Sequence, residues 1–208
     1  MVRAWIADVT PLLNKACYDR YYGQVPDFRR EKADALRLDK MKAQSIGVWI
    51  LWQKIRAAYD LPESTSFNLS HSGTYVMCAA CMDGGQARVG CDIEQKSSMK
   101  MNFVRRYFCS EEYETIAGAK TEEERTDLFF RYWVLKESFM KATGKGMALP
   151  VNSFCIRMGR PPVLIRKPEE FTEPYYYCEY EIEGFPYKMA VCSSDADIDT
   201  ELHTELTL

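Results

Sequence analysis

A capped helix in the middle of the chain constrains the fold more than any other feature of the sequence. Thr121 to Glu124 has the spacing of a capping box, in which the threonine hydroxyl and the last glutamate each bind a free backbone amide. No proline interrupts the residues that follow before Gly144, and glycine commonly ends a helix. We therefore expect a helix that begins at Thr121 and ends near Thr143.

Apolar and β-branched segments on both sides of this helix predict strands, and therefore an α+β fold. The expected strands span residues 2–9, 67–70, 74–82, 87–94, 150–158, 163–166, 175–182, 187–193 and 198–206. Asp83-Gly84-Gly85 is expected to form a hairpin turn between the third and fourth of them, and the strands after the capped helix are expected to form a meander. A second long helix is expected over Arg29–Tyr59, with Gly47 as a point of interruption.

The composition is that of a globular protein without a strong overall charge. Of the 208 residues, 47% are hydrophobic and 27% are charged, and the net charge is -3. This length allows one compact unit or two small lobes. Because the net charge is small and negative, no overall field would draw the chain onto nucleic acid.

The amino terminus and the cysteines predict a cytoplasmic protein that binds no membrane. Residues 1–11 lack the basic start and apolar stretch of a secretory signal, and no run approaches the roughly 18 apolar residues of a membrane span. The eight cysteines lie mostly in apolar segments, so reduced thiols are expected. Cys78 and Cys81 have the spacing of a metal or redox pair, but no second pair exists and both are expected in the core.

The segment Val89–Glu94 carries the first candidate site residues. A period of two places Asp92 and Glu94 on one face of a strand. Two carboxylates this close repel each other unless a cation lies between them, and hard oxygen ligands suit Mg²⁺. The alternative is a solvated strand end, because two acids at this spacing are a common pattern.

The capped helix carries a third candidate ligand. Helical spacing places Trp133, Glu137 and Lys141 on one face. An exposed pair such as Glu137 and Lys141 would ordinarily be worth about 0.3 to 0.5 kcal/mol. However, a glutamate beside a large aromatic residue on an apolar helix would be costly to bury without a partner. A metal shared with Asp92 and Glu94 would supply that partner.

The segment Phe67–Gly73 places hydroxyl groups and an imidazole at a strand end. Ser70 and His71 are donors of the kind that bind phosphate oxygens, so an anion site is one interpretation. A structural turn held by hydrogen bonds is the other.

Together these segments resemble the 4'-phosphopantetheinyl transferases of the larger, Sfp-like type. The resemblance is carried, in order along the chain, by residues 67–73, 90–94, 108–113 and 133–141. It implies two similar α/β lobes in a pseudo-twofold arrangement, with the active site between them. Residues 1–95 would form the N-terminal lobe and residues 96–208 the C-terminal lobe.

The resemblance also implies a reaction. Coenzyme A would lie between the lobes, with its pyrophosphate on Mg²⁺ or Mn²⁺ held by Asp92, Glu94 and Glu137. A serine of an apo carrier protein of the acyl, peptidyl or aryl type would attack the phosphorus nearer the pantetheine, and 3',5'-ADP would leave. Lys141 would stabilise the departing phosphate. Glu137 could also take the serine proton, although a metal role would lower its basicity.

By the same resemblance, four residues would bind coenzyme A. Ser70 and His71 would contact its phosphates, and Arg29 and Lys32 would contact the 3'-phosphate of the ribose. For Arg29 and Lys32 a solvated helix start is the alternative.

The chain departs from the family pattern at three places. The Gly-Lys-Pro that commonly precedes the Ser-His-Ser turn in the family is absent, and Leu61–Ser64 stands in its place. Gln44 stands where the family has a basic residue, with Lys40 and Lys42 as substitutes. Cys109 replaces a small hydroxyl residue, so Ser110 is expected to cap the following helix instead.

The stretch from Gln95 to Ser110 is the expected docking site of the carrier. It has no acidic residue and carries four basic ones, with Met99, Met101 and Phe103 among them. Carrier proteins of this family are generally acidic, so charge would favour the encounter. The alternative is a solvated loop between the lobes.

Two other functions compete with this interpretation. The first is a different Mg²⁺-dependent phosphotransferase or hydrolase, but the chain has no glycine-rich nucleotide motif. The second is a non-catalytic protein that binds carriers or coenzyme A, which would be expected to lack Glu137 or Lys141. Both residues are present.

Overall fold

The computed structural model describes residues 1–208 and confirms a mixed α+β fold. The strands are β1 Val2–Asp8, β2 Phe67–Ser72, β3 Tyr75–Cys81, β4 Val89–Gln95, β5 Cys155–Arg157, β6 Val163–Arg166, β7 Tyr176–Tyr180, β8 Tyr187–Ser193 and β9 Ile198–His203. The α-helices are α1 Lys15–Tyr22, α2 Asp27–Asp34, α3 Asp39–Ala58, α4 Met101–Tyr107, α5 Ser110–Ala117 and α6 Glu122–Ala142. Short 3-10 helices lie at Thr10–Leu13, Gly146–Ala148 and Val151–Ser153. None of the helices combines the length and apolar character needed to cross a membrane.

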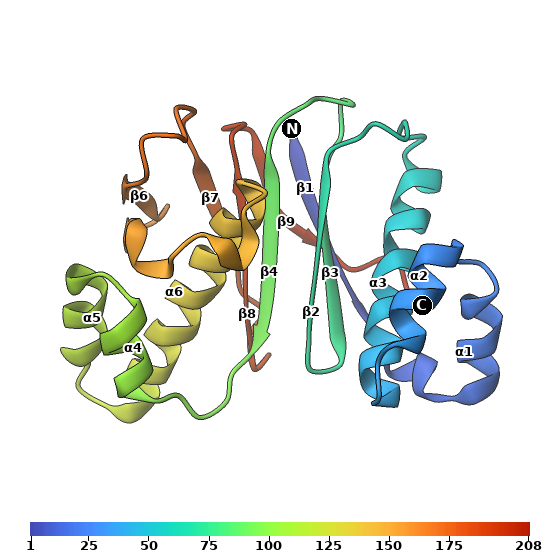
Figure 1. Cartoon of the computed structure of the whole chain (residues 1–208), viewed down its shortest axis with the longest axis horizontal. Helices are drawn as coiled ribbons and strands as arrows, with labels where there is room; N and C mark the ends of the chain where they lie inside the picture. The colour runs from blue at the N-terminus through green and yellow to red at the C-terminus, as the bar shows by residue number, and fades with distance from the viewer.

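The strands form two main sheets whose faces share one core. The first sheet has the order β2-β3-β1-β9 and the second the order β4-β8-β7, while β5 and β6 form a separate antiparallel pair. Side chains from β1, β3, β4 and β8 meet in a single buried apolar cluster. In Figure 1, α1–α3 lie on the outer side of the first sheet and α4–α6 on the outer side of the second. The chain is therefore layered as helices, sheet, sheet and helices.

This layering explains the composition of the central strands. In β3 every residue except Tyr75 is buried, because α3 packs on one face and the second sheet on the other. A strand covered on both faces is expected to be apolar throughout. Cys78 and Cys81 lie in this strand as buried free thiols, which confirms their predicted place in the core.

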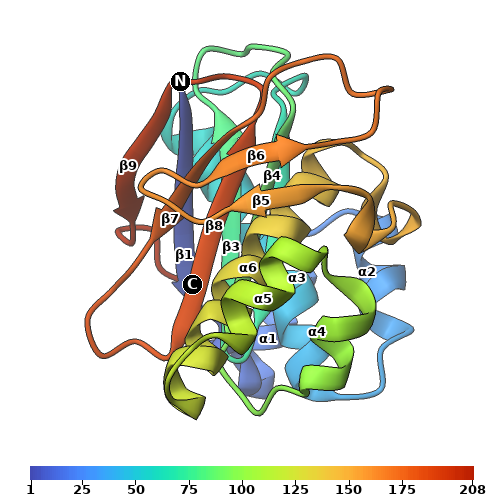
Figure 2. The same cartoon turned by 90° about the vertical axis from the view of Figure 1, so that its left-hand side faces the viewer.

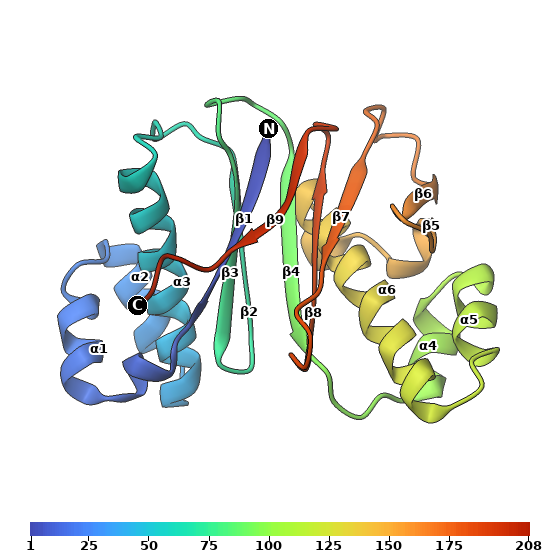
Figure 3. The ribbon, with the colours of Figure 1, turned by 180° about the vertical axis from the view of Figure 1, so that it is seen from behind.

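Two strands carry the chain between the two sheets. β4 pairs with β8 in the second sheet, and β9 pairs in parallel with β1 in the first, as Figure 3 shows from behind. The predicted hairpin from β3 into β4 and the predicted meander after the capped helix are therefore wrong. β4 crosses to the other sheet because its apolar face completes the core between the sheets. The boundary between the two lobes at residue 95 stays a proposal. The chain passes from the first sheet to the second earlier than that, before β4 begins.

The predicted helix over Arg29–Tyr59 is divided differently from the prediction. α2 and α3 are separated at residues 35–38, and not at Gly47. Gly47 lies inside α3, where a Cβ atom would come within 2.6 Å of Val9 Cγ1. The glycine therefore lets α3 lie close to the residue that follows β1, and it marks a packing contact instead of a break.

The sequence analysis missed α1. The Asn14 side chain caps this helix by accepting hydrogen bonds from the Ala16 and Cys17 amides. The helix has no buried residue, so it lacks the apolar stripe that would have marked it in the sequence.

The capped helix is confirmed as α6. Thr121 Oγ1 accepts a hydrogen bond from the Glu124 amide at 3.1 Å, and Glu124 Oε2 accepts one from the Thr121 amide at 3.1 Å. Gly144 ends the helix with a φ of 72°, in the left-handed region that favours glycine. In Figure 2, α4, α5 and the β5–β6 pair face the viewer in front of α6.

Gly90 allows α6 to lie directly against β4. A Cβ atom at this position would come within 2.0 Å of the Ser138 carbonyl oxygen and 2.4 Å of the Ala142 amide nitrogen. Any larger residue would therefore push the helix away from the strand. The close approach also sets the height of Lys141, which lies between these two helix residues, above β4.

We predict that Gly90→Ala destabilises the protein by at least about 3 kcal/mol, the upper range for overpacking a core, because backbone atoms and not a flexible side chain occupy the space. Urea unfolding would measure this loss. Gly23→Ala is the matched control, since Gly23 has a φ of -66° and its closest Cβ contact would be 3.7 Å. A Gly90→Ala protein as stable as the control would contradict the packing argument.

Candidate active site

β4 places Asp92 and Glu94 on the face of the second sheet that α6 covers. Cys91 and Ile93 point the other way, into the core between the sheets. Asp92 lies opposite Ala190 in β8, and Ala190 belongs to the core under α6. The alternation predicted from the period of two is therefore confirmed.

Asp92, Lys141 and Ser70 form a compact hydrogen-bonded cluster. Lys141 Nζ lies 2.6 Å from Asp92 Oδ1, 3.0 Å from Ser70 Oγ and 3.2 Å from the Cys91 carbonyl oxygen. Because an ammonium group has three donors, these contacts account for all of them. Burial alone would lower the pKa of Lys141, but Asp92, Cys91 and Glu137 together outweigh it and raise the pKa, so the amine stays charged. The cluster joins β2, β4 and α6 at one point.

The carboxylates here carry more negative charge than Lys141 balances. Asp92 is buried, and its Oδ2 has no hydrogen-bond partner. Burial, together with the charge of Asp92, raises the pKa of Glu94 to about 7. Burial and Asp92 also raise the pKa of Glu137. A second cation at this place would relieve the repulsion and favour the ionised carboxylates.

The donor chemistry fits a hard divalent cation such as Mg²⁺. Asp92 Oδ2 is the oxygen left for it, since Lys141 binds Oδ1. The ligand oxygens of Asp92, Glu94 and Glu137 do not all lie within 4.8 Å of one another. A shared cation would therefore draw the Glu94 and Glu137 side chains toward Asp92.

Ser72 belongs to this site although the sequence analysis did not single it out. Its hydroxyl donates to Glu94 Oε2 at 2.8 Å. The parallel bond from Ser70 Oγ to Asp92 Oδ1 is 2.7 Å long. Each carboxylate of β4 is therefore held by a serine of β2. The signal was present in the sequence, because Ser72 follows Ser70 at the period of a strand.

The Ser-His-Ser segment is a strand end and not a turn. Ser70 and His71 lie in β2, and the turn follows at Gly73 and Thr74. The Ser70 hydroxyl donates a hydrogen bond to Asp92, whereas His71 is exposed. Partial desolvation of the ring, together with the charges of Lys141 and Lys32, lowers the pKa of His71. The His71 imidazole therefore loses its proton more readily than a free histidine.

Arg29 is a buried cation without a carboxylate partner. Its guanidinium carbon lies 4.7 Å from the centre of the Trp49 ring. Both Arg29 Nε and Trp49 Nε1 are buried donors without an acceptor. Burial lowers the pKa of Arg29. Lys32, one turn further along α2, is exposed.

Gln44 has a structural contact in place of a charge. Its Nε2 donates to the Gly73 carbonyl oxygen at 2.9 Å and so ties α3 to the turn between β2 and β3. Lys40 is exposed at the start of α3, and Lys42 is half-buried. Neither lysine forms an ion pair in the structure.

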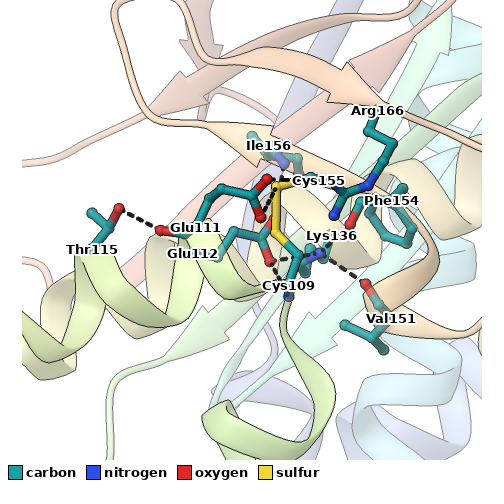
Figure 4. The surroundings of a disulfide bond; sticks show 10 residues. All are labelled: Cys109, Glu111, Glu112, Thr115, Lys136, Val151, Phe154, Cys155, Ile156 and Arg166. Atoms are coloured by element: carbon teal, nitrogen blue, oxygen red, sulfur yellow. Dashed lines mark hydrogen bonds and ion pairs between the residues drawn. A yellow bond between two sulfur atoms is a disulfide. The ribbon is translucent and has the colours of Figure 1, made fainter.

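A buried ion pair fixes α6 next to Glu137. Lys136 Nζ lies 2.8 Å from Glu112 Oε2, and both side chains are 0% exposed. The same ammonium donates to the carbonyl oxygens of Val151 and Phe154, as Figure 4 shows. Glu112 therefore holds α5 against α6, and removing one partner of such a pair would cost about 3 to 5 kcal/mol.

Cys109 and Cys155 form a disulfide beside this ion pair. The prediction that all eight cysteines are reduced is therefore wrong for these two, while the other six are free. Cys109 is also the N-cap of α5 and Ser110 is its first residue, so the predicted cap at Ser110 is wrong. A separation of 46 residues gave no spacing signal for the disulfide, which depends on the tertiary contact between α5 and β5.

The acid-free stretch contains α4 and presents both charge and apolar surface. Phe103 and Tyr107 are exposed by 37% and 38%, and their rings lie 4.8 Å apart. Arg105 and Arg106 lie in the last turn of the same helix and form no ion pair in the structure. Phe103 also packs against Trp133 of α6, with ring centres 5.5 Å apart. α4 therefore packs directly against the helix that carries Glu137.

A sizeable cavity lies elsewhere, at the edge of the second sheet. Its volume is about 750 Å³, and it is lined by residues of β7, β9 and the loop before β6. None of the predicted site residues lines it. This cavity is therefore separate from the candidate active site.

Comparison with known proteins gives a consistent family match. Residues 88–192 match the sequence model of the 4'-phosphopantetheinyl transferase superfamily. The chain is 38% identical over 144 residues to the 4'-phosphopantetheinyl transferase Sfp of Bacillus subtilis, an overlap of 69% of this chain and 61% of that protein. It is 38% identical over 94 residues to the human L-aminoadipate-semialdehyde dehydrogenase-phosphopantetheinyl transferase, an overlap of 42% and 29%. The chain thus spans less than two thirds of the length of these relatives.

We predict that, without metal, the free energy of unfolding falls as the pH rises through about 7, because Glu94 then loses a proton that the folded state holds more tightly than the unfolded chain. An unfolded glutamate titrates near 4.3, so this stabilisation is complete below that pH and is lost above 7. Urea unfolding between pH 5 and pH 8 would measure the slope. Glu94→Gln should flatten it, and an unchanged slope in that variant would contradict the assignment.

Proposed function

Because the chain belongs to the 4'-phosphopantetheinyl transferase superfamily, we propose that it transfers the 4'-phosphopantetheine of coenzyme A to a serine of an apo carrier protein and releases 3',5'-ADP. The observation that carries this proposal is the meeting of Asp92, Glu94, Glu137 and Lys141 at the end of β2. These residues come from two elements, β4 and α6, that the fold draws together beside β2. A cytoplasmic location remains a prediction of the sequence.

We assign metal binding to Asp92, Glu94 and Glu137. The unpartnered Asp92 Oδ2 and the raised pKa of Glu94 both support a cation between these groups. When bound, Mg²⁺ or Mn²⁺ would neutralise the pyrophosphate oxygens and the charge that develops on the leaving group. The protein's own part is to hold the three carboxylates against that charge.

We assign charge stabilisation of the departing phosphate to Lys141. The serine oxygen forms the new bond to the phosphorus nearer the pantetheine, and the bond from that phosphorus to the bridging oxygen of 3',5'-ADP breaks. Lys141 stays protonated and lies beside the carboxylates. Since all three of its donors are engaged, it acts through its charge or exchanges one of these bonds for a phosphate oxygen.

Glu137 is the candidate base for the serine proton. Burial and Asp92 raise its pKa, and a carboxylate of higher pKa is a stronger base at neutral pH. Coordination to a metal would act in the opposite direction. The proton would pass from the serine hydroxyl to Glu137 directly or through one water.

We assign the phosphates of coenzyme A to the donors around β2 and α2. His71 is exposed at the end of β2, and Ser70 acts there through Asp92 and Lys141 as well. Arg29 and Trp49 provide two buried donors without an acceptor, which supports an anion such as the 3'-phosphate at this place. Lys32 would add charge from the surface.

We assign carrier docking to the stretch Gln95–Ser110. Arg105 and Arg106 form no ion pair within the chain, and Phe103 and Tyr107 offer exposed aromatic surface beside them. A basic patch with an apolar centre suits an acidic partner helix. The contact from Phe103 to Trp133 places this patch next to α6.

We predict that Glu137→Gln lowers the rate of transfer by about 100-fold or more, as expected for the loss of a general base, without unfolding the protein. The assay incubates the protein with coenzyme A, Mg²⁺ and an apo carrier and weighs the carrier by mass spectrometry. Glu123→Gln is the control, since Glu123 lies exposed on the same helix and has no ion pair. If the unmodified protein adds no phosphopantetheine to fatty-acid, polyketide or peptide carriers, the proposed function is refuted. If it does, a metal chelator should abolish the gain in mass.

We also predict that Arg29→Met raises the KM for coenzyme A about tenfold or more, as expected for the loss of a charge-assisted hydrogen bond. The KM for 3'-dephospho-coenzyme A should not change, because that substrate lacks the group assigned to Arg29. Arg37→Met is the control, since Arg37 is exposed between α2 and α3 and forms no ion pair. An equal rise in KM for both substrates would show that Arg29 does not recognise the 3'-phosphate.

A further inference from the structure

The two sheets meet at their edge strands without backbone pairing. β2 is an edge of the first sheet and β4 is an edge of the second. β2 pairs only with β3, and β4 pairs only with β8. In an antiparallel pair, every second amide of the outer strand points away from its partner. In β4 these outward amides belong to Cys91, Ile93 and Gln95.

Side chains of β2 accept hydrogen bonds from these three amides. Asn68 Oδ1 accepts from the Cys91 amide at 3.1 Å. Ser70 Oγ accepts from the Ile93 amide at 3.4 Å. Ser72 Oγ accepts from the Gln95 amide at 3.0 Å. The separation in sequence is 23 residues in each case, so β2 runs parallel to β4 in a fixed register.

We call these three hydrogen bonds between β4 amides and β2 side chains rungs. Two of the rungs also hold the acidic side chains. Ser70 and Ser72 accept from β4 amides and also donate to Asp92 and Glu94. A slip of β2 along β4 would break both sets of bonds together. The position of the carboxylates therefore depends on the register between the two sheets.

We propose that Asn68 and Ser72 are positioning residues that set this register and thereby orient Asp92 and Glu94 for metal and substrate. The proposal rests on the proposed function of the carboxylates. Asn68 is the more informative of the two residues, because its side-chain oxygen contacts the Cys91 amide and neither carboxylate. Its effect on the metal site must pass through the backbone of β4.

Contacts at the end of β2 support the same role for this strand. The Tyr187 hydroxyl oxygen of β8 accepts a hydrogen bond from the Thr74 amide at 3.1 Å. A Cβ atom on Gly73 would come within 2.1 Å of that hydroxyl, so a side chain there would displace the Tyr187 hydroxyl from the turn. The second sheet therefore holds the β2–β3 turn directly, and the three rungs continue that contact along the strand.

Amide hydrogen exchange tests whether the rungs exist in solution. In Asn68→Leu, which removes the acceptor with little change in size, exchange at Cys91 should rise about tenfold or more. In Ser72→Ala, the same rise should appear at Gln95. Ala79 in the centre of β3 should exchange as slowly as in the unmodified protein. Unchanged exchange at both Cys91 and Gln95 would overturn the proposal.

Metal affinity tests whether the rungs position the carboxylates. The dissociation constant of Mn²⁺, measured from the free ion by electron paramagnetic resonance, should rise about tenfold in Asn68→Leu and in Ser72→Ala, which is the usual lower range for residues that orient metal ligands. Ser72→Thr keeps the hydroxyl and should restore the affinity. Ser66→Ala removes a hydroxyl with no hydrogen-bond partner just before β2 and should have no effect.

The two proposals fail in different ways. If the unmodified protein neither binds Mn²⁺ nor modifies a carrier, the proposed function is wrong. If it does both, and the Asn68→Leu and Ser72→Ala variants bind Mn²⁺ as tightly as it does, the positioning role is wrong. Loss of affinity in Ser72→Ala that Ser72→Thr does not restore would also overturn it, because the hydroxyl would then not be the acting group.

Discussion

The contact between Lys141 and Asp92 is the interaction on which the candidate site depends. At 2.6 Å it links α6 to β4 and brings Ser70 of β2 into the same cluster. The contact is possible only because Gly90 lets the helix backbone lie against the strand. A single glycine therefore sets the distance between the helix that carries Glu137 and the strand that carries the other two carboxylates. The buried pair of Lys136 and Glu112 then holds the helix from its other side.

The hydrogen bonds between β2 and β4 explain how two sheets with separate ladders can form one site. Backbone pairing would place the strands about 4.8 Å apart and leave no room for side chains between them. Short polar side chains instead bridge the two edges, and the serines use the same oxygen to accept from the backbone and to orient a carboxylate. An apolar residue at position 68 or 70 of β2 would leave an amide of β4 without this acceptor.

Local sequence patterns predicted single helices and strands better than they predicted which strands or cysteines pair with each other. The capping box of α6 and the alternation of Asp92 and Glu94 depend on neighbours within a few residues, and both are confirmed. The family resemblance carried by these motifs is confirmed by the match over residues 88–192. The sequence analysis did not predict that β4 joins the second sheet and β9 the first, because sheet membership depends on apolar faces that are distant in the sequence. The Cys109–Cys155 disulfide was missed for the same reason, since no local spacing marks it.

The two oxygens of Asp92 differ in their contacts, which bears on the proposed metal site. Oδ1 is bound by Lys141 and Ser70, and Oδ2 has no partner. A metal at Oδ2 would leave the lysine contact intact, so the elements need not separate when it binds. Without a metal, ionised Glu94 is unfavourable, because burial beside Asp92 raises its pKa to about 7. A divalent ion would lower that pKa, so metal binding and deprotonation of Glu94 favour each other. The bonds from Lys141 and Ser70 to Asp92 Oδ1 therefore leave Oδ2 open to the proposed cation.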